Sequence, residues 1–401
     1  MADANIQKAL DAYYSGDRDT AGKLLKQLAA STDGSKPPAG LSALDESSFH
    51  ELAGSLAMDR GDLENAVKSF KLMVEREESA GGDKNNLATS YGKLGEALAS
   101  FGKTDDAVAA FEKGCVLKEE ANAPAPSRVN LYLQYGQVLL HASRNQKAAE
   151  WLRKALKAGN ESKQDDGTLA HLNFFLGEAL KPTLAQLHAT RKFQEVVRQV
   201  QQEQTGKSGN EDAQQKKILD GWQAEAENCY NTAIKLAEKV KLPAPTILQM
   251  QRGLAEVYHD GGKPVPAVMA RRKAVKLSDE AKVDPLARGF IWHGLAESLK
   301  ELGQNAEAVK TYEGAIKHKQ AGKADGVSLA KSYFGLGEAL IGEQKLDPAV
   351  EAIRAAIKHE DGAAKPDKQQ RLSKYYNTLG MVLQAAGKEK EAEEALKMAK
   401  G

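Results

Sequence analysis

The sequence predicts an all-α protein built as an array of repeated helix hairpins. The phrase Leu-Gly-Glu-Ala-Leu begins at Leu94, Leu176 and Leu336. We take its Gly, or the Ala that replaces it, as the marker of each unit, and most markers are 41 residues apart: Gly54, Gly95, Gly136, Gly177, Ala255, Ala296, Gly337 and Gly380. Self-similarity at one period indicates a repeat array, which can continue as one body over 401 residues.

The composition of the chain indicates which classes of partner and which cellular compartment to expect. The chain has 56 basic and 55 acidic residues and a net charge of +1, so no overall field favours nucleic acid or anionic lipid. Cys115 and Cys229 have no second Cys or His at metal-ligand spacing, and we expect reduced, half-buried thiols. The amino-terminal residues lack an apolar run of signal length, and no apolar run approaches 18 residues. We therefore expect a cytoplasmic protein without nucleic-acid binding or membrane insertion.

The first element is a weak copy of the repeat. Residues 6–28 carry Ala9, Gly16, Ala21 and Leu25 at the repeat spacing, and residues 34–42 have the composition of a loop. Residues 1–45 are therefore expected to form an atypical capping repeat followed by a loop.

The hairpin pattern is clearest in the unit that surrounds Gly95. Tyr91, Leu94, Gly95 and Leu98 share one helical face, and Gly102 follows where a helix end favours a left-handed residue. A second helix then presents small and aromatic residues to the first. Matching residues recur in the other units: His50, Gly54, Gly61, Ala66, Phe70; Tyr132, Gly136, Ala148, Leu152; Trp292, Ala296, Gly303, Ala308, Tyr312; Tyr333, Gly337, Ala349, Ile353; Tyr376, Gly380, Gly387, Ala392 and Leu396.

This pattern resembles the tetratricopeptide repeat, with an aromatic residue, Leu-Gly and a second-helix Ala-x3-Phe. The longer step is similar to the variant found in kinesin light chains and many bacterial repeat proteins. The resemblance implies a right-handed superhelix of antiparallel helix hairpins, in which the first helix of each unit lines a concave groove. We expect four units in residues 46–204 and four in residues 246–401.

One interval departs from the common step. From Gly177 to Ala255 there are 78 residues, which leaves room for one further unit. Ala189 and Phe193 would complete the unit of Gly177, and residues 205–245 would form either a degenerate repeat with a turn at Gly221 or a disordered tip, 204–214, followed by one long helix to Lys239. Both alternatives stay open. The irregular segment around 183–219 could also self-associate.

The resemblance places two positions of each first helix in the groove. The residue after the marker and the residue one helical turn earlier are expected to face a ligand: Glu96, Leu133, Gln137, Phe174, Glu178, Arg252, Glu256, His293, Glu297, Phe334 and Glu338. A ladder of carboxylates with apolar gaps suits a partner peptide or helix that carries basic residues. The same Glu residues could instead be helix formers on a solvated face, paired locally with Arg252 or His293.

The sequence gives little indication of catalysis. Phe101-Gly102-Lys103-Thr104 ends like a phosphate-binding loop, but the first Gly of that motif would fall at Ala97, inside a helix. The eight histidines are scattered, so we expect no catalytic, cofactor-binding or metal-binding residues. The predicted function is a non-catalytic adaptor or scaffold that binds a partner peptide. The alternative is a peptide-sensing regulator whose superhelix changes shape on binding.

Overall fold

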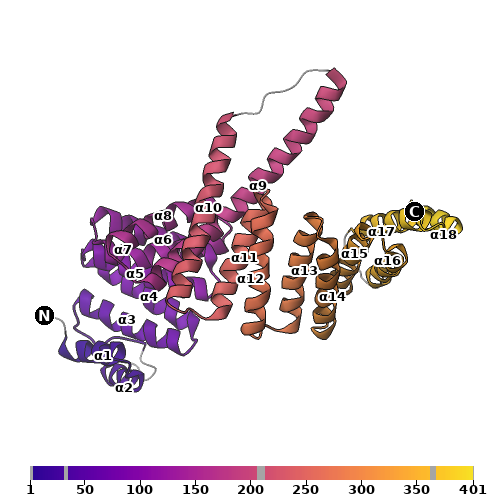
Figure 1. Ribbon diagram of the computed structural model, residues 1–401. Coiled ribbons are helices and arrows are strands. Elements are labelled where there is room, and N and C mark those ends of the chain that lie inside the picture. The colour runs from indigo at the N-terminus through magenta and orange to yellow at the C-terminus, as the bar shows by residue number, and fades with distance from the viewer. Residues whose placement is uncertain (1–2, 31–34, 206–212, 362–366, 401) are drawn as a thin grey trace. The chain divides into compact units, whose positions relative to one another are not determined.

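The structure is a computed structural model that describes residues 3–30, 35–205, 213–361 and 367–400. These residues form 18 helices and no strand (Figure 1). They divide into two compact units, Met1–Thr183 and Leu184–Gly401. The all-α prediction is confirmed. The boundary between the units lies inside the helix α9, Asp166–Thr205.

The first unit consists of four helix hairpins and the beginning of α9. Each hairpin pairs two consecutive helices, and both helices of the three later hairpins are 17 residues long. The helices are α1 Ala4–Tyr14, α2 Arg18–Leu28, α3 Ala43–Asp59, α4 Leu63–Ser79, α5 Lys84–Ser100, α6 Thr104–Glu120, α7 Ala125–His141 and α8 Asn145–Glu161.

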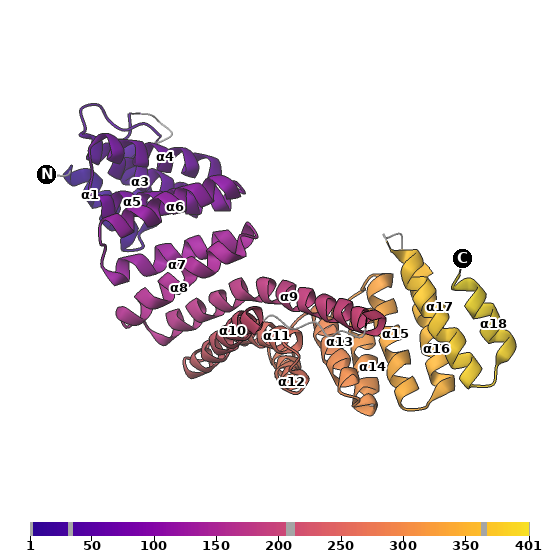
Figure 2. The ribbon, with the colours of Figure 1, turned by 90° about the horizontal axis from the view of Figure 1, so that it is seen from above.

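The second unit continues from α9 and contains the remaining helices. In Figure 2 its later helices follow one another as stacked antiparallel pairs. They are α10 Ala213–Lys239, α11 Ala244–Asp260, α12 Pro264–Glu280, α13 Pro285–Glu301, α14 Asn305–Ala321, α15 Gly326–Gly342, α16 Leu346–Asp361, α17 Lys368–Ala385 and α18 Glu389–Met398.

The turn within a hairpin is set by one residue in the left-handed region. Gly102 has φ +81°, and its N–H donates to the Ala99 carbonyl oxygen while that of Lys103 donates to Leu98. These bonds satisfy carbonyl groups that the end of α5 would otherwise leave open, and glycine adopts the conformation without strain. The expected helix end at Gly102 is confirmed, and Gly16 has the same role between α1 and α2 with φ +95°.

The marker glycine is required by close helix packing. A Cβ atom on Gly95 would lie 2.7 Å from Phe111 Cδ2, and one on Gly136 would lie 2.5 Å from Leu152 Cγ. Phe111 and Leu152 are buried on the second helix of the same hairpin. Packing a large side chain against the marker glycine buries apolar surface. This burial stabilises the folded state by about 1.5 to 3 kcal/mol for each large side chain.

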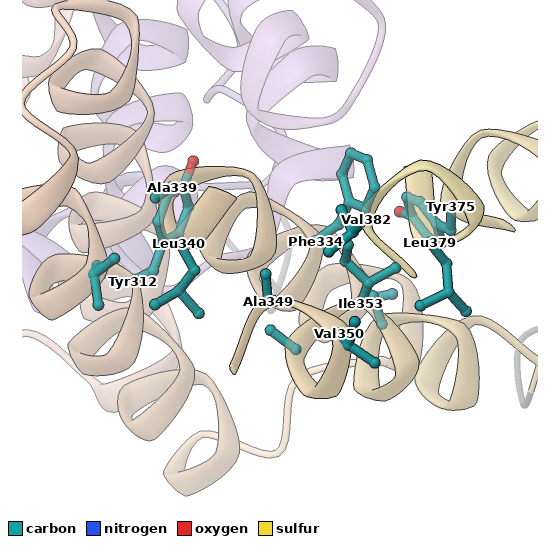
Figure 3. Packing of buried hydrophobic residues seen from close by; sticks show 14 of the residues in the cluster. Tyr312, Phe334, Ala339, Leu340, Ala349, Val350, Ile353, Tyr375, Leu379 and Val382 are labelled. Carbon is teal, nitrogen blue, oxygen red and sulfur yellow. The ribbon is translucent and has the colours of Figure 1, made fainter. Parts of the chain in front are cut away.

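The same contacts build a continuous core through the last three repeats. Tyr312, Ile353 and Leu383 are at most 1% exposed and belong to one cluster that extends from α12 to α18. Figure 3 shows residues of this cluster from successive helices lying against one another. Cys115 and Cys229 are buried, and thus more enclosed than the half-buried thiols expected from the sequence.

The segment after Gly177 contradicts the expected hairpin. Helix α9 continues through Ala189 and Phe193, so both residues lie on the helix that carries the marker. Leu184 stands seven residues after the marker, where the unit of Gly95 has Gly102, and it is buried in the helix without a turn. No proline interrupts α9 between Leu184 and its end at Thr205. Phe193 lies in this stretch and is 69% exposed.

The following segment forms one long helix. Gly221 lies inside α10, so the turn required by the degenerate-repeat alternative is absent. Of the predicted tip at 204–214, residues 206–212 lie outside the described part of the chain.

Candidate functional site

The groove positions predicted from the sequence lie on the first helices of successive repeats. Helices α5, α7 and α9 carry those of the first unit, and α11, α13 and α15 carry those of the second. Where a helix carries two predicted residues, they are one helical turn apart and lie on the same face of that helix. Because the two units are separate compact bodies, each wall is described by itself.

In the first unit, predicted residues from three repeats line one cavity of about 980 Å³. Glu96 comes from α5, Gln137 from α7, and both Phe174 and Glu178 come from α9. Leu133 is half-buried and is not among the lining residues. The cavity therefore joins two carboxylates, an amide and an aromatic ring that are far apart in the sequence.

Apolar side chains form much of the remaining wall of this cavity. Phe111, Val138, Leu140 and Phe175 contribute from three helices, α6, α7 and α9. None of the four was predicted as a site residue, because the repeat pattern assigns Phe111 to helix packing and does not single out Val138, Leu140 or Phe175. A signal was present for Phe175 alone, since it is adjacent to Phe174 on the same helix turn.

The charges around the cavity are mainly negative. Gln134 Nε2 lies 3.5 Å from Glu96 Oε2, and Lys181 Nζ lies 3.1 Å from Glu178 Oε1 on the same helix. Neither lysine nor arginine is found among the side chains that line the cavity. Glu96 thus presents its charge on an exposed position, while the charge of Glu178 is partly balanced by a neighbour.

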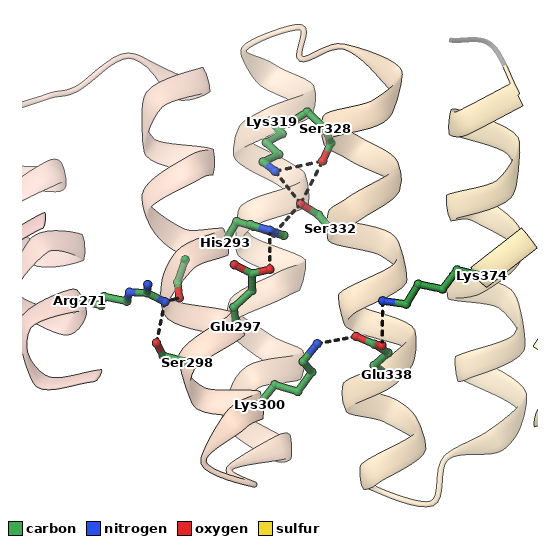
Figure 4. A network of polar contacts seen from close by, with 11 residues as sticks. Arg271, His293, Glu297, Ser298, Lys300, Lys319, Ser328, Ser332, Glu338 and Lys374 are labelled. Atoms are coloured by element: carbon green, nitrogen blue, oxygen red, sulfur yellow. Dashed lines mark hydrogen bonds and ion pairs between the residues drawn. The ribbon is translucent and has the colours of Figure 1, made fainter. Parts of the chain in front are cut away.

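In the second unit, fixed cations reach the predicted carboxylates from adjacent repeats (Figure 4). Lys300 Nζ lies 2.5 Å from Glu338 Oε2, and Lys374 Nζ lies 3.9 Å from Glu338 Oε1. Glu297 Oε1 lies 3.4 Å from His293 Nε2. Burial acts to raise the pKa of Glu297, but the hydrogen bond from His293 and the nearby positive charges lower it overall. This wall therefore carries charge pairs and not a row of open carboxylates.

Two further predicted residues of the second unit lie beside a small pocket. Arg252 and Glu256 line a space of about 100 Å³ together with Arg271 and Phe290. Arg271 occupies the position where other repeats have a buried aromatic or aliphatic residue, and it donates to Ser298 Oγ at 2.6 Å.

Phe334 corrects the prediction for the second groove. It is only 5% exposed, and its ring stacks on that of Tyr375 with centroids 4.5 Å apart. The next repeat covers this ring, so Phe334 belongs to the core between α15 and α17. The one-turn spacing from the marker identified the helix face, but it could not show how closely the following helix approaches.

A buried polar chain connects the core of the second unit to Glu297. Lys319 is 1% exposed, and its Nζ donates to Ser332 Oγ at 2.8 Å and to the Ser328 carbonyl oxygen at 3.0 Å. Ser332 Oγ lies 3.0 Å from His293 Nδ1, as Figure 4 shows. Burial lowers the pKa of Lys319 to about 8. The sequence pattern does not predict this hydrogen-bond network, because its residues come from three helices, α13, α14 and α15.

Comparison with known proteins supports the repeat assignment. Three family models described as tetratricopeptide repeat match residues 45–120, 92–163 and 291–320. No curated protein matches the chain. No helix among the described residues is long and apolar enough to cross a membrane.

Solved structures of repeat proteins are similar to this chain at low sequence identity, and the fold is shared with the first of those described next. The apo form of RapI is similar over 98% of this chain and 95% of its own, with 10% identity and a TM-score of 0.55. BtubC from P. vanneervenii matches 64% of this chain and 87% of its own at 19% identity and a TM-score of 0.45. Kinesin light chain-like repeats from Podosopora anserina match 45% of this chain and 87% of their own at 23% identity and a TM-score of 0.39.

The matched segments coincide with the helix hairpins of α3 to α8 and of α13 and α14. Those hairpins share their marker contacts with the remaining ones, such as Gly337 against Ile353 and Gly380 against Leu396. The hairpins within residues 45–163 and 291–320 match the tetratricopeptide repeat, and the fold is that of a tetratricopeptide repeat solenoid.

Proposed function

We propose that this protein is a non-catalytic adaptor that binds a peptide or helical segment of a partner protein in the cavity of its first unit. The observation that carries the proposal is the convergence of Glu96, Gln137 and Glu178 on one cavity. Equivalent positions of three successive repeats meet there, which is the arrangement needed to contact an elongated ligand at regular intervals.

The chemistry of the cavity favours a basic ligand with large apolar side chains. The described residues that line the cavity include two carboxylates, Glu96 and Glu178, and no lysine or arginine. Such a lining attracts ammonium or guanidinium groups. The apolar wall formed by Phe174, Phe175 and Val138 can cover a large side chain of the ligand. Glu96 and Glu178 belong to the first and third of three successive repeats, with Gln137 between them, and this spacing suits charges placed along an extended or helical segment.

The second unit is less suited to the same ligand. Glu338 already contacts Lys300 and Lys374, and Glu297 contacts His293. A basic peptide would have to displace two lysines of other repeats from Glu338. In the first unit Glu178 is paired with Lys181 of its own helix, whereas Glu96 is exposed and accepts a hydrogen bond from the uncharged Gln134. We therefore assign the basic segment to the first unit alone.

Fluorescence anisotropy with paired synthetic peptides tests the proposal. The two peptides of a pair share their apolar residues and differ only in carrying Lys or Glu at the polar positions. We expect the basic member to bind saturably and the acidic member to bind at least about tenfold more weakly. Glu96→Gln combined with Glu178→Gln should weaken basic-peptide binding by about tenfold.

Glu64→Gln is the matched control for these variants. Glu64 lies on α4, away from the cavity, and forms an exposed pair with Lys68. Its removal should leave peptide affinity unchanged. Equal binding of acidic and basic peptides, or equal losses in the control and the double variant, would reject the basic-segment proposal. Absence of saturable binding across a broad set of such pairs would reject peptide binding in this cavity.

A further inference from the structure

We propose that one occupant of this cavity is a second copy of the chain, which inserts the hairpin formed by α9 and α10. The inference rests on the proposed function, since it uses the same cavity in the first unit.

The hairpin brings two exposed apolar residues to the same level. His188 Nε2 lies 3.0 Å from Gln223 Oε1, which fixes the register of the antiparallel helices. Five residues further along α9 is Phe193, and five residues earlier on α10 is Ile218. They are 69% and 49% exposed, respectively. Figure 1 shows the distal ends of α9 and α10 extending beyond the end of α11.

Phe193 is exposed because α9 does not turn back on itself. In other repeats, the residue sixteen positions after the marker packs on it, as Phe111 packs on Gly95. Phe193 is the equivalent residue after Gly177, but the continuous helix carries it away from that marker. Val197 lies one turn further along α9 and is 37% exposed. Phe193 and Val197 therefore form an apolar strip on one face of α9.

Basic residues flank the apolar strip. Lys192 precedes Phe193 and Lys217 precedes Ile218, and both lysines are exposed. The cavity offers Glu96 and Glu178 beside an apolar wall, without lysine or arginine among its lining side chains. Hairpin and cavity therefore match in both respects, positive charge with carboxylate and apolar side chain with aromatic wall.

Such a contact joins two different surfaces of identical chains. A heterologous contact leaves one cavity and one hairpin unused at the ends of a dimer, so further copies can add. We expect association that grows with protein concentration beyond a dimer. It should weaken as salt increases, because part of the attraction comes from exposed charges.

Sedimentation velocity on the full chain tests this proposal. We expect the wild-type sedimentation coefficient to rise over a roughly hundredfold range of concentration at low salt. Glu96→Lys with Glu178→Lys disables the cavity, and Phe193→Ser with Ile218→Ser disables the hairpin, so each double variant alone should remain monomeric. Both changes are at exposed or half-exposed positions, and circular dichroism should show native helicity in each variant.

Mixing the two double variants provides the decisive measurement. One variant keeps its hairpin and the other keeps its cavity, so the mixture should form a dimer that does not grow further. A wild-type chain that stays monomeric, a mixture that stays monomeric, or double variants that still associate would each overturn the proposal. If the wild-type chain is monomeric but binds basic peptides, the proposed function stands and this inference fails.

Discussion

At the marker position of each repeat, a side chain on the second helix limits the size of the residue. Leu152 lies against Gly136 so closely that a Cβ atom would be 2.5 Å from Leu152 Cγ. Real Cβ atoms do not approach carbon atoms to this distance, so the helices would have to move apart. Well-packed interiors resist such movement. The glycine of the repeated phrase is thus a packing requirement.

Replacement of this glycine should destabilise the protein. Gly136→Ala is expected to lower the free energy of unfolding by about 1 to 3 kcal/mol through overpacking. Gly221→Ala is the matched control, because Gly221 lies inside α10 with no atom within 4 Å of its added Cβ. The control should raise stability by up to about 1 kcal/mol through helix propensity. Urea unfolding measures both, and equal effects would contradict the packing argument.

Lys319 carries a charge into the core between two repeats. Its pKa of about 8 lies below the ordinary value of 10.5, because burial disfavours the ammonium form. Below pH 8 both folded and unfolded chains hold the proton, and the folded chain bears the cost of burying it. Between pH 8 and 10.5 the folded chain loses this proton while the unfolded chain keeps it. Unfolding then takes up a proton, so stability rises with pH.

Comparison with Lys319→Met should isolate this effect. We expect the stability of the wild type relative to the variant to increase by about 1 to 2 kcal/mol from neutral pH to pH 10. Urea unfolding at several pH values gives the difference directly. Lys68→Met is a suitable reference, since Lys68 is 63% exposed and forms a surface pair. A difference that falls or stays constant with pH would show that the Lys319 ammonium group is not disfavoured by burial.

At the scale of the element, the helix hairpins follow from the sequence and α9 does not. The marker, the residue at the turn and the packed residue sixteen positions later predicted the regular hairpins correctly. After Gly177 the sequence has Ala189 and Phe193 at the positions that pack in other repeats. Leu184, however, occupies the position at which other repeats turn. A leucine is poorly suited to positive φ, and the helix continues. The presence of the turn residue is therefore more informative than the packed residues.

The exposed part of the α9–α10 hairpin should open more readily than the stacked repeats. Its side chains at 192–195, 197 and 216–218 are exposed, whereas Tyr132, Tyr135 and Leu139 of α7 are at most 1% exposed. Few buried contacts oppose local opening of the hairpin. In dilute solution we expect amide hydrogens at 192–197 and 216–218 to exchange at least about tenfold faster than those of α7. Equal protection would contradict this view of the hairpin.

At the scale of the whole molecule, repeats with the same residue at the same position differ in electrostatic setting. Glu96 and Glu338 both follow the marker, yet Glu338 contacts Lys300 and Lys374 from other repeats. Periodicity predicted the helix face of both residues. It could not predict their charge partners, which come from positions 38 and 36 residues away in the sequence. The same limit explains why Phe334 is covered and Phe174 lines the cavity.

The central claim is that the carboxylates of the first unit select a basic ligand. Charge reversal tests it most directly. Anisotropy titrations of Glu96→Lys with Glu178→Lys should show reversed preference within each peptide pair, with the acidic peptide bound more tightly than the basic one, because the added lysines repel the basic peptide and attract the acidic one. A folded double variant that still prefers the basic peptide would contradict the claim.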